Sequence, residues 1–213
     1  MSGAAEPNRK IRILIADDHF VVRMGLAALF TTERDFEIVA EAGDGVQAVD
    51  LYRKHLPDVA LIDLSMPRKT GITVIREICK TNPDARVLVL SVFDGDEDIF
   101  RSLDAGALGY VLKNSPAERW VPAIRAVAKG ERWIPPEVAS RLATRKMFEP
   151  LTDREIEVLQ QLSKGLANKQ IADVLQISEY TIKDHLKHIL GKLRVCDRTE
   201  AVTAALQRGI IHL

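Results

Sequence analysis

The stretch DVALIDL, residues 58–64, is a short apolar run that carries a carboxylate, Asp63, near its end. Four further runs rich in Val, Ile and Leu lie between residues 11 and 113. They are IRILIA (11–16), FEIVAEA (36–42), RVLVLSV (86–92) and ALGYVLK (107–113). Apolar runs of this length without polar alternation are typical of strands buried on both faces of a sheet. The pattern therefore predicts five buried strands.

The segments between these runs have helical spacing, as at Val22, Leu26 and Leu29. We expect helices at residues 19–31, 45–55, 71–81, 95–105 and 117–129. Strands that alternate with helices in this way predict an α/β fold, a five-stranded parallel sheet with helices on both faces.

The chain of 213 residues is long enough for two small domains. Pro135 and Pro136 interrupt the alternating pattern, and a short helix at about 136–146 is expected after them. Beyond residue 150 every apolar run has the helical period. We predict a first domain at 10–130, a linker at 131–149, and an all-α domain of four helices at 150–213.

Composition restricts the possible functions. The 30 basic and 30 acidic residues balance, so a case for nucleic-acid binding must rest on the local placement of charge. Cys79 and Cys196 have no metal-ligand spacing and suggest reduced thiols. The apolar run that follows the first ten residues is too short for a signal peptide or a membrane span, so we expect a cytoplasmic protein with no membrane partner.

Polar groups follow four of the predicted strands. Asp17 and Asp18 follow the first, Asp63 the third, Ser91 the fourth and Lys113 the fifth. Ligands of an open parallel sheet collect at the carboxyl ends of its strands. A single Asp there is usually a helix cap or a turn residue. Three carboxylates at one edge, however, repel each other unless a cation neutralises them, and Mg²⁺ suits such oxygen ligands.

The same residues have the chemistry for phosphoryl transfer. A carboxylate such as Asp63 can act as a nucleophile toward phosphorus. Lys113 can pair with Asp63 or with a bound phosphoryl group, and the Ser91 hydroxyl can donate to a phosphoryl oxygen.

The segments ADDH (16–19), LIDLSMP (61–67), VLVLS (87–91) and GYVLK (109–113) resemble the receiver domain of bacterial response regulators over about residues 10–130. The resemblance implies a flavodoxin-like sheet of strand order 2-1-3-4-5. It also implies the roles of the site residues: Mg²⁺ ligands Asp17, Asp18, Asp63 and the backbone carbonyl of Ser65; phosphoacceptor Asp63; switch residues Ser91, Tyr110 and Lys113.

Two positions in this part of the chain leave questions open. Tyr110 is either a switch aromatic or a strand tyrosine packed on a helix. Where related receivers often have Gly-x-x-Gly, this chain has Arg68-Lys69-Thr70-Gly71, which makes the loop beside the acceptor basic.

The C-terminal segment carries helix signals. Thr152 and Glu155 form a capping box, and Gly165 closes that helix. Asn168 is expected to cap a second, short helix and Ser178 a third. A short helix, a tight turn and a longer helix predict a helix-turn-helix.

Two faces of the third helix differ in character. Ile182, Leu186, Ile189 and Leu193 make one buried stripe. Tyr180, Lys183, Asp184 and Lys187 share another face, which is either a plain solvated surface or one that reaches guanine edges and phosphates.

The segment from Leu151 to Leu193, together with CDRTEAV (196–202), resembles the LuxR-type helix-turn-helix. The resemblance implies that the third helix enters the major groove, and it assigns DNA contacts as follows: bases to Lys183, Asp184 and Lys187; backbone phosphate to Asn168 and Lys169. Asp184 departs from the small apolar residue often found there, so it either accepts from a cytosine amino group or repels phosphate.

The last helix, capped near Asp197, places Val202 and Leu206 on one face. The resemblance implies that this helix forms a homodimer on an inverted-repeat operator; the alternative is that both residues pack on their own domain.

As a whole the chain resembles the NarL/FixJ family of two-component response regulators. That resemblance implies a transcription regulator rather than an enzyme, phosphorylated by a cognate sensor histidine kinase. Two alternatives remain. One is a flavodoxin-like enzyme or nucleotide binder, which should carry a Gly-rich loop where Asp-Asp-His stands. The other is a receiver that signals through protein contacts alone.

Overall fold

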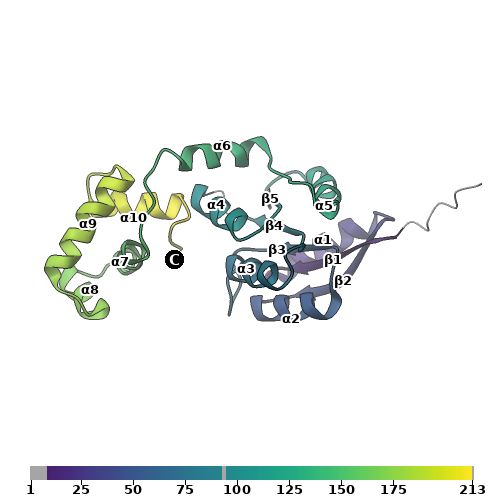
Figure 1. Ribbon diagram of the computed structural model, residues 1–213, viewed down its shortest axis with the longest axis horizontal. Helices are drawn as coiled ribbons and strands as arrows, with labels where there is room; N and C mark the ends of the chain where they lie inside the picture. Colours follow the sequence, from purple (N-terminus) through teal and green to yellow (C-terminus); the bar gives the residue numbers. More distant parts are fainter. Residues whose placement is uncertain (1–8, 93–94, 213) are drawn as a thin grey trace, which may run out of the picture. The chain divides into compact units, whose positions relative to one another are not determined.

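A computed structural model describes residues 9–92 and 95–212 of the chain (Figure 1). The chain divides into two compact units, one within residues 1–92 and 101–136 and one within residues 93–100 and 137–213. Each unit is described by itself.

The first unit is built on a parallel sheet of strand order β2-β1-β3-β4-β5, as expected. Its strands are β1 (Ile11–Ala16), β2 (Phe36–Ala42), β3 (Val59–Ile62), β4 (Val87–Ser91) and β5 (Gly109–Leu112). The helices that connect or follow the strands along the chain are α1 (Phe20–Thr31), α2 (Gly45–His55), α3 (Gly71–Thr81), α4 (Asp96–Asp104) and α5 (Trp120–Ala128). Residues 96–100 of α4 are grouped with the second unit and residues 101–104 with the first. The predicted α/β architecture is thus confirmed.

Burial explains why these runs form strands. All four residues of β3 and all five of β4 are buried, so each strand is covered on both faces. Leu26 and Phe30 of α1 and Ile124 and Val127 of α5 pack with strand residues in one apolar cluster. Figure 1 shows α2 and α3 side by side along the sheet.

The helix expected at 117–129 begins differently from the prediction. Residues Ala117–Arg119 form a 3₁₀ turn, and the regular helix α5 starts at Trp120. Pro122 lacks the N–H that would bond to the carbonyl of residue 118, so the α-helical ladder cannot extend across this turn. The short helix expected at 136–146 is present as α6 (Pro136–Arg145).

The helices after residue 150 are α7 (Asp153–Ser163), α8 (Asn168–Leu175), α9 (Glu179–Leu193) and α10 (Arg198–Gln207). The capping box is confirmed, because the Thr152 hydroxyl accepts from the N–H of Glu155 while the Glu155 carboxylate accepts from the N–H of Thr152. Ser178 caps α9 and Asp197 caps α10, as predicted. Residues of all four helices share one apolar core.

The prediction that Asn168 caps α8 is wrong. The N-cap is Ala167, whose backbone N–H donates to the Gln170 side chain at 2.8 Å. The Gln170 side chain thus pairs with the backbone N–H of Ala167, so the helix is capped one residue earlier than predicted and Asn168 is its first residue.

Among the described residues, no helix is long and apolar enough to cross a membrane.

Candidate functional site

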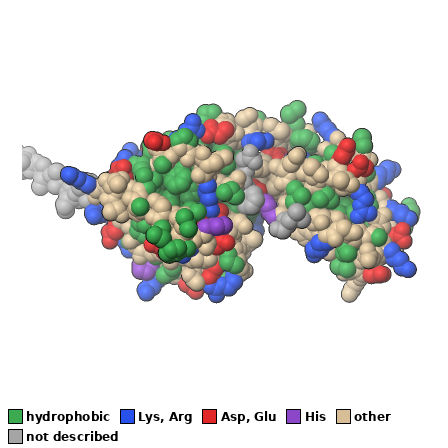
Figure 2. Space-filling view, turned by 180° about the vertical axis from the view of Figure 1, so that it is seen from behind, with side chains coloured by type: hydrophobic (Ala, Val, Ile, Leu, Met, Phe, Trp, Pro, Cys, Tyr) green, Lys and Arg blue, Asp and Glu red, His purple; other side chains and the backbone are tan. Residues whose placement is uncertain are grey.

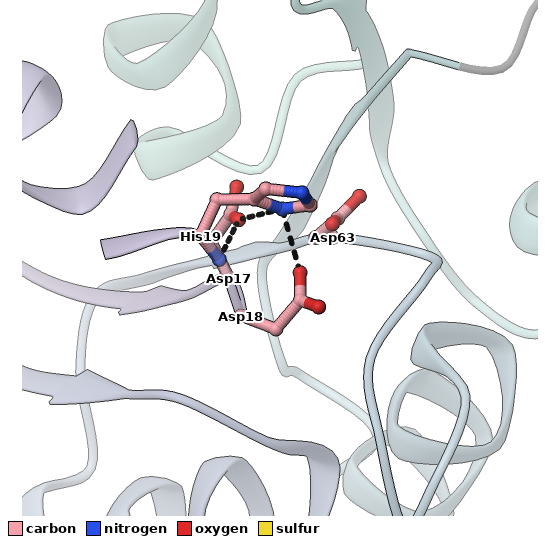
Figure 3. Close-up of side chains that lie close together, drawn as sticks. All are labelled: Asp17, Asp18, His19 and Asp63. Carbon is pink, nitrogen blue, oxygen red and sulfur yellow. Dashed lines mark hydrogen bonds and ion pairs between the residues drawn. The ribbon is translucent and has the colours of Figure 1, made fainter. Parts of the chain in front are cut away.

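Three carboxylates gather at the carboxyl end of the sheet. Asp17 and Asp18 directly follow β1, and Asp63 directly follows β3, the strand paired with β1. The backbone N–H of Asp63 donates to the carbonyl of Ala16 at 2.8 Å, which ties the two strand ends together. Asp17 and Asp63 are buried, whereas Asp18 is exposed. Figure 3 shows the three side chains around one point.

Lys113 supplies the positive charge of the site. Its Nζ lies 2.6 Å from Asp17 Oδ2 and 2.9 Å from Asp63 Oδ2. Its backbone N–H donates to the carbonyl of Ser91, which fixes the end of β5 against the end of β4. One ammonium therefore neutralises only part of the charge of two buried carboxylates.

The electrostatic state of the site follows from this arrangement. Burial raises the pKa of Asp63, and the charge of Asp17 adds to that effect, while the hydrogen bond with Lys113 works in the opposite direction. Burial alone would lower the pKa of Lys113, but its bonds with Asp17 and Asp63 outweigh burial and raise it. The environment of ionised Asp63 thus favours the binding of a further cation.

The residues fit a hard divalent cation. Asp63 Oδ1 is buried and has no hydrogen-bond partner in the part of the chain that the structure describes. A buried carboxylate oxygen without a partner is unfavourable, and a metal ion satisfies it. Asp17, Asp18, His19 and Asp63 each offer a ligand atom within 4.8 Å of the others.

Sequence reasoning did not include His19 in the site. Its Nδ1 lies 2.7 Å from Asp18 Oδ1 and 3.3 Å from Asp17 Oδ1 (Figure 3). The signal was present in the sequence, since His19 directly follows the two carboxylates at the strand end.

The other predicted residues of the site differ in burial. Ser91, the last residue of β4, and Tyr110 in β5 are fully buried. The Tyr110 side chain is therefore in the interior and not at the surface. Ser65, in the loop that follows Asp63, is exposed between buried Leu64 and Met66.

The basic loop after Asp63 forms ion pairs with residues of the neighbouring helices. Arg68 adopts a left-handed φ of 68° and forms an ion pair with Asp44, the N-cap of α2. Lys69 pairs with Glu77 of α3 at 2.5 Å and, through its hydrogen bond, lowers the pKa of that carboxyl. Gly71 is required by close approach, because a Cβ there would meet the Asp63 carbonyl at 2.1 Å. The positive charges of the loop are therefore partly neutralised by neighbouring acids.

The α9 helix presents the predicted second face. Tyr180, Lys183, Asp184 and Lys187 are exposed, while Ile182 and Ile189 on the stripe are fully buried. Lys183 pairs with Glu179 at 3.0 Å, and Asp184 lies 3.9 Å from His188 Nδ1. Basic and acidic side chains both occur on the visible face of the second unit in Figure 2.

The other predicted contact residues lie as follows. Lys169 is exposed on α8, while Asn168 is half-buried with its Oδ1 unpartnered among the described residues. Val202 and Leu206 of α10 are half-buried and pack against the core of their own unit. The alternative that they serve their own domain is therefore consistent with the structure.

This fold and its acidic site are those of a receiver domain joined to a helical DNA-binding domain, and comparison with known families agrees. Residues 13–125 match the response regulator receiver domain, and residues 149–205 match the luxR family of bacterial regulatory proteins.

Relatives match along nearly the whole chain. The nitrate/nitrite response regulator protein NarP of Escherichia coli strain K12 is 41% identical over 204 residues, which cover 92% of this chain and 95% of NarP. A structure of two RcsB dimers bound to two parallel DNAs has a TM-score of 0.68 and 27% identity, over 93% of this chain and 99% of RcsB. A structure of RcsB from Salmonella enterica serovar Typhimurium, bound to promoter rprA in the presence of phosphomimetic BeF3⁻, has a TM-score of 0.67. It is 27% identical over 93% of this chain and 99% of RcsB.

The chain belongs to the NarL/FixJ-type response regulators, which join a receiver domain to a LuxR-type helix-turn-helix. It is a two-component, DNA-binding regulator of transcription. Receiver domains of this family bind Mg²⁺ at an acidic pocket, and Asp17, Asp18 and Asp63 form an acidic cluster in this chain.

Proposed function

We propose that Asp63 accepts a phosphoryl group from a cognate sensor histidine kinase, and that phosphorylation controls sequence-specific DNA binding by the domain at 150–213. The observation that carries this proposal is the buried Asp63 carboxylate, with one oxygen paired to Lys113 and the other unpartnered in the described chain. A nucleophile needs a lone pair that no hydrogen bond occupies.

Four groups are proposed to hold Mg²⁺: the carboxylates of Asp17, Asp18 and Asp63, and the backbone carbonyl of Ser65. When bound, Mg²⁺ neutralises charge on the phosphoryl oxygens. Lys113 holds the Asp63 carboxylate in place and pairs with the phosphoryl group after transfer. The transfer forms an acyl phosphate bond at Asp63 and breaks the phosphorus–nitrogen bond of the donor phosphohistidine.

The switch is proposed to run through Ser91 and Tyr110. The Ser91 hydroxyl, at the end of the strand next to β3, donates to a phosphoryl oxygen, and its movement changes the packing around buried Tyr110. Phosphorylation thereby alters the face made by α4, β5 and α5.

The output is proposed to be a homodimer on an inverted-repeat operator, read by α9. Lys183, Asp184 and Lys187 face the bases, while Asn168 and Lys169 face the phosphate backbone. The dimer is proposed to form through α10, at Val202 and Leu206, whose side chains are partly covered by the core of their own unit. Because its target is DNA, the protein is proposed to act in the cytoplasm, as a regulator and not an enzyme. The linker at 131–149 joins the two parts.

DNase footprinting with and without acetyl phosphate tests the whole proposal. Protection of a defined inverted repeat should strengthen on phosphorylation of the wild type and stay unchanged for Asp63→Asn. Wild-type protection that does not respond to acetyl phosphate, despite stoichiometric labelling, would contradict the switch. A labelled protein that protects no sequence would support signalling through protein contacts alone.

A further inference from the structure

His19 lies in position to act on a metal ion at the acidic cluster. Its backbone N–H donates to Asp17 Oδ1 at 2.9 Å, which fixes the residue at the end of β1. Its ring nitrogen Nδ1 lies 2.7 Å from Asp18 Oδ1. In Figure 3 the ring lies over the space between Asp17, Asp18 and Asp63. The imidazole therefore shares the site with the carboxylates.

The distances allow one ion to contact the imidazole and the carboxylates together. The ligand atoms of the four residues lie within 4.8 Å of one another. Ligands on opposite sides of an ion, each about 2.1 Å from it, are about 4.2 Å apart. The His19 side chain is 65% exposed, so a shift of a few tenths of an ångström meets little resistance.

A second observation points independently to a cation. Asp63 Oδ1 is buried and has no hydrogen-bond partner in the described chain. The Asp63 carboxylate belongs to the same cluster as the His19 ring. The site thus combines an unsatisfied hard oxygen with a nitrogen donor.

Nitrogen changes which ions the site prefers. Mg²⁺ is bound through carboxylates, waters and phosphate oxygens, whereas imidazole suits divalent ions such as Co²⁺, Ni²⁺ and Zn²⁺. A neutral ring has one lone pair, on the nitrogen that carries no proton. When Nδ1 donates to Asp18, that lone pair is on Nε2.

We propose that His19 is a nitrogen ligand of this site and widens its selectivity from Mg²⁺ to divalent transition-metal ions that bind imidazole. The inference rests on the proposed function, since it assumes that the three carboxylates bind a divalent cation. It adds that His19 contributes to the affinity of the site for Co²⁺ and not to its affinity for Mg²⁺.

Calorimetric titration of the full chain with CoCl2 and, separately, with MgCl2 at pH 8 tests the inference. The variants are His19→Asn, a control His55→Asn at the far end of α2, and Asp63→Asn to define binding elsewhere. We expect the Co²⁺ affinity of His19→Asn to fall about tenfold or more, with a Mg²⁺ affinity within about twofold of wild type. His55→Asn should match wild type for both ions.

A second readout shows coordination directly. The proton NMR spectrum of the Co²⁺-loaded wild type should contain a hyperfine-shifted imidazole N–H resonance, absent in His19→Asn and retained in His55→Asn. Equal loss of Co²⁺ and Mg²⁺ affinity in His19→Asn, or an unchanged ratio, would overturn the inference and leave the proposed function standing. If no ion binds in an Asp63-dependent manner, the proposed metal site itself fails.

Discussion

Lys113 Nζ lies 2.9 Å from Asp63 Oδ2, and the same ammonium lies 2.6 Å from Asp17. Two buried carboxylates therefore share one buried cation. The consequence is an excess of negative charge at the carboxyl end of the sheet. Substitutions that remove the charge of Lys113 or of Asp63 should therefore change the free energy of unfolding in opposite directions.

Asp63→Asn should raise the free energy of unfolding of the first unit in the presence of a chelator, by about 1 kcal/mol. The change removes a charge whose burial is unfavourable and keeps the Lys113–Asp17 pair. Lys113→Met should lower it by about 3 kcal/mol, because two buried carboxylates lose their counter-ion. Tryptophan fluorescence in urea is a suitable probe, since Trp120 and Trp133 both belong to this unit. If both substitutions change the free energy of unfolding in the same direction, the site does not carry an excess of negative charge.

Glu155 of the capping box should give the second unit a defined pH dependence. Burial works to raise its pKa, but the hydrogen bonds from Lys192 and Thr152 outweigh burial and lower it. A lowered folded-state pKa contributes stability above the unfolded value of 4.5, which is lost as the pH falls through the folded value. Glu155→Gln should therefore destabilise α7 by about 1–3 kcal/mol at pH 7 and progressively less below pH 4.5.

Hydrogen exchange of α7 amides in the full chain measures this effect, because no tryptophan lies in the second unit. Glu157→Gln, on the exposed side of the same helix, is the control and should change little. A Glu155→Gln effect of equal size at pH 4 and pH 7 would mean that charge is not the cause.

Arg68 occupies a left-handed backbone conformation in the loop beside Asp63. Arg68→Gly and Arg68→Ala both remove the ion pair with Asp44, but glycine adopts a positive φ without the clash of a Cβ. The glycine variant should be more stable than the alanine variant by about 1 kcal/mol in thermal or urea unfolding. An alanine variant as stable as the glycine variant would indicate that the loop relaxes to another conformation.

Lys183 and Lys187 should contribute unequally to DNA binding. Lys183 pairs with Glu179 at 3.0 Å, and this pair must open before the ammonium meets a base. Among the described residues Lys187 has no ion pair. Lys187→Ala should weaken binding to the operator by about 1–3 kcal/mol and relax one base position. Lys183→Ala should weaken binding less.

Fluorescence anisotropy with operator and scrambled duplexes at fixed salt measures both losses. Lys164→Ala, beyond the end of α7, is a charge-matched control and should leave affinity nearly unchanged. An equal loss on both duplexes for Lys187→Ala would reassign it to a phosphate contact.

Much of the fold could be predicted from the sequence because strands such as β3 and β4 are buried on both faces. The expectation of burial was wrong for the edge strand β2, in which only Phe36 and Ala42 are buried. A run such as VLVLS is short and rich in β-branched residues, which favours a buried strand over a buried helix, and all five of its residues are buried. The predicted starts of two helices were wrong where a single backbone N–H, present or missing, determines the start. Pro122 divides the last receiver helix, and the Ala167 N–H bonded to Gln170 moves the start of α8.

The acidic cluster followed from the rule that strand ends of a parallel sheet meet at one edge. What that rule cannot supply is side-chain direction. It did not show that the His19 ring turns toward Asp18 or that Arg68 reaches Asp44. Both contacts depend on loop conformations that short-range patterns leave undetermined.

Intact mass and peptide mapping after incubation with acetyl phosphate and MgCl2 test the central claim most directly. Wild-type protein should gain one phosphoryl group, mapped to the peptide containing Asp63 and lost on treatment with hydroxylamine. Asp63→Asn should gain none, and a chelator should abolish labelling of the wild type. An Asp63→Asn protein labelled to the same extent as wild type would contradict the assignment of Asp63 as the phosphoacceptor.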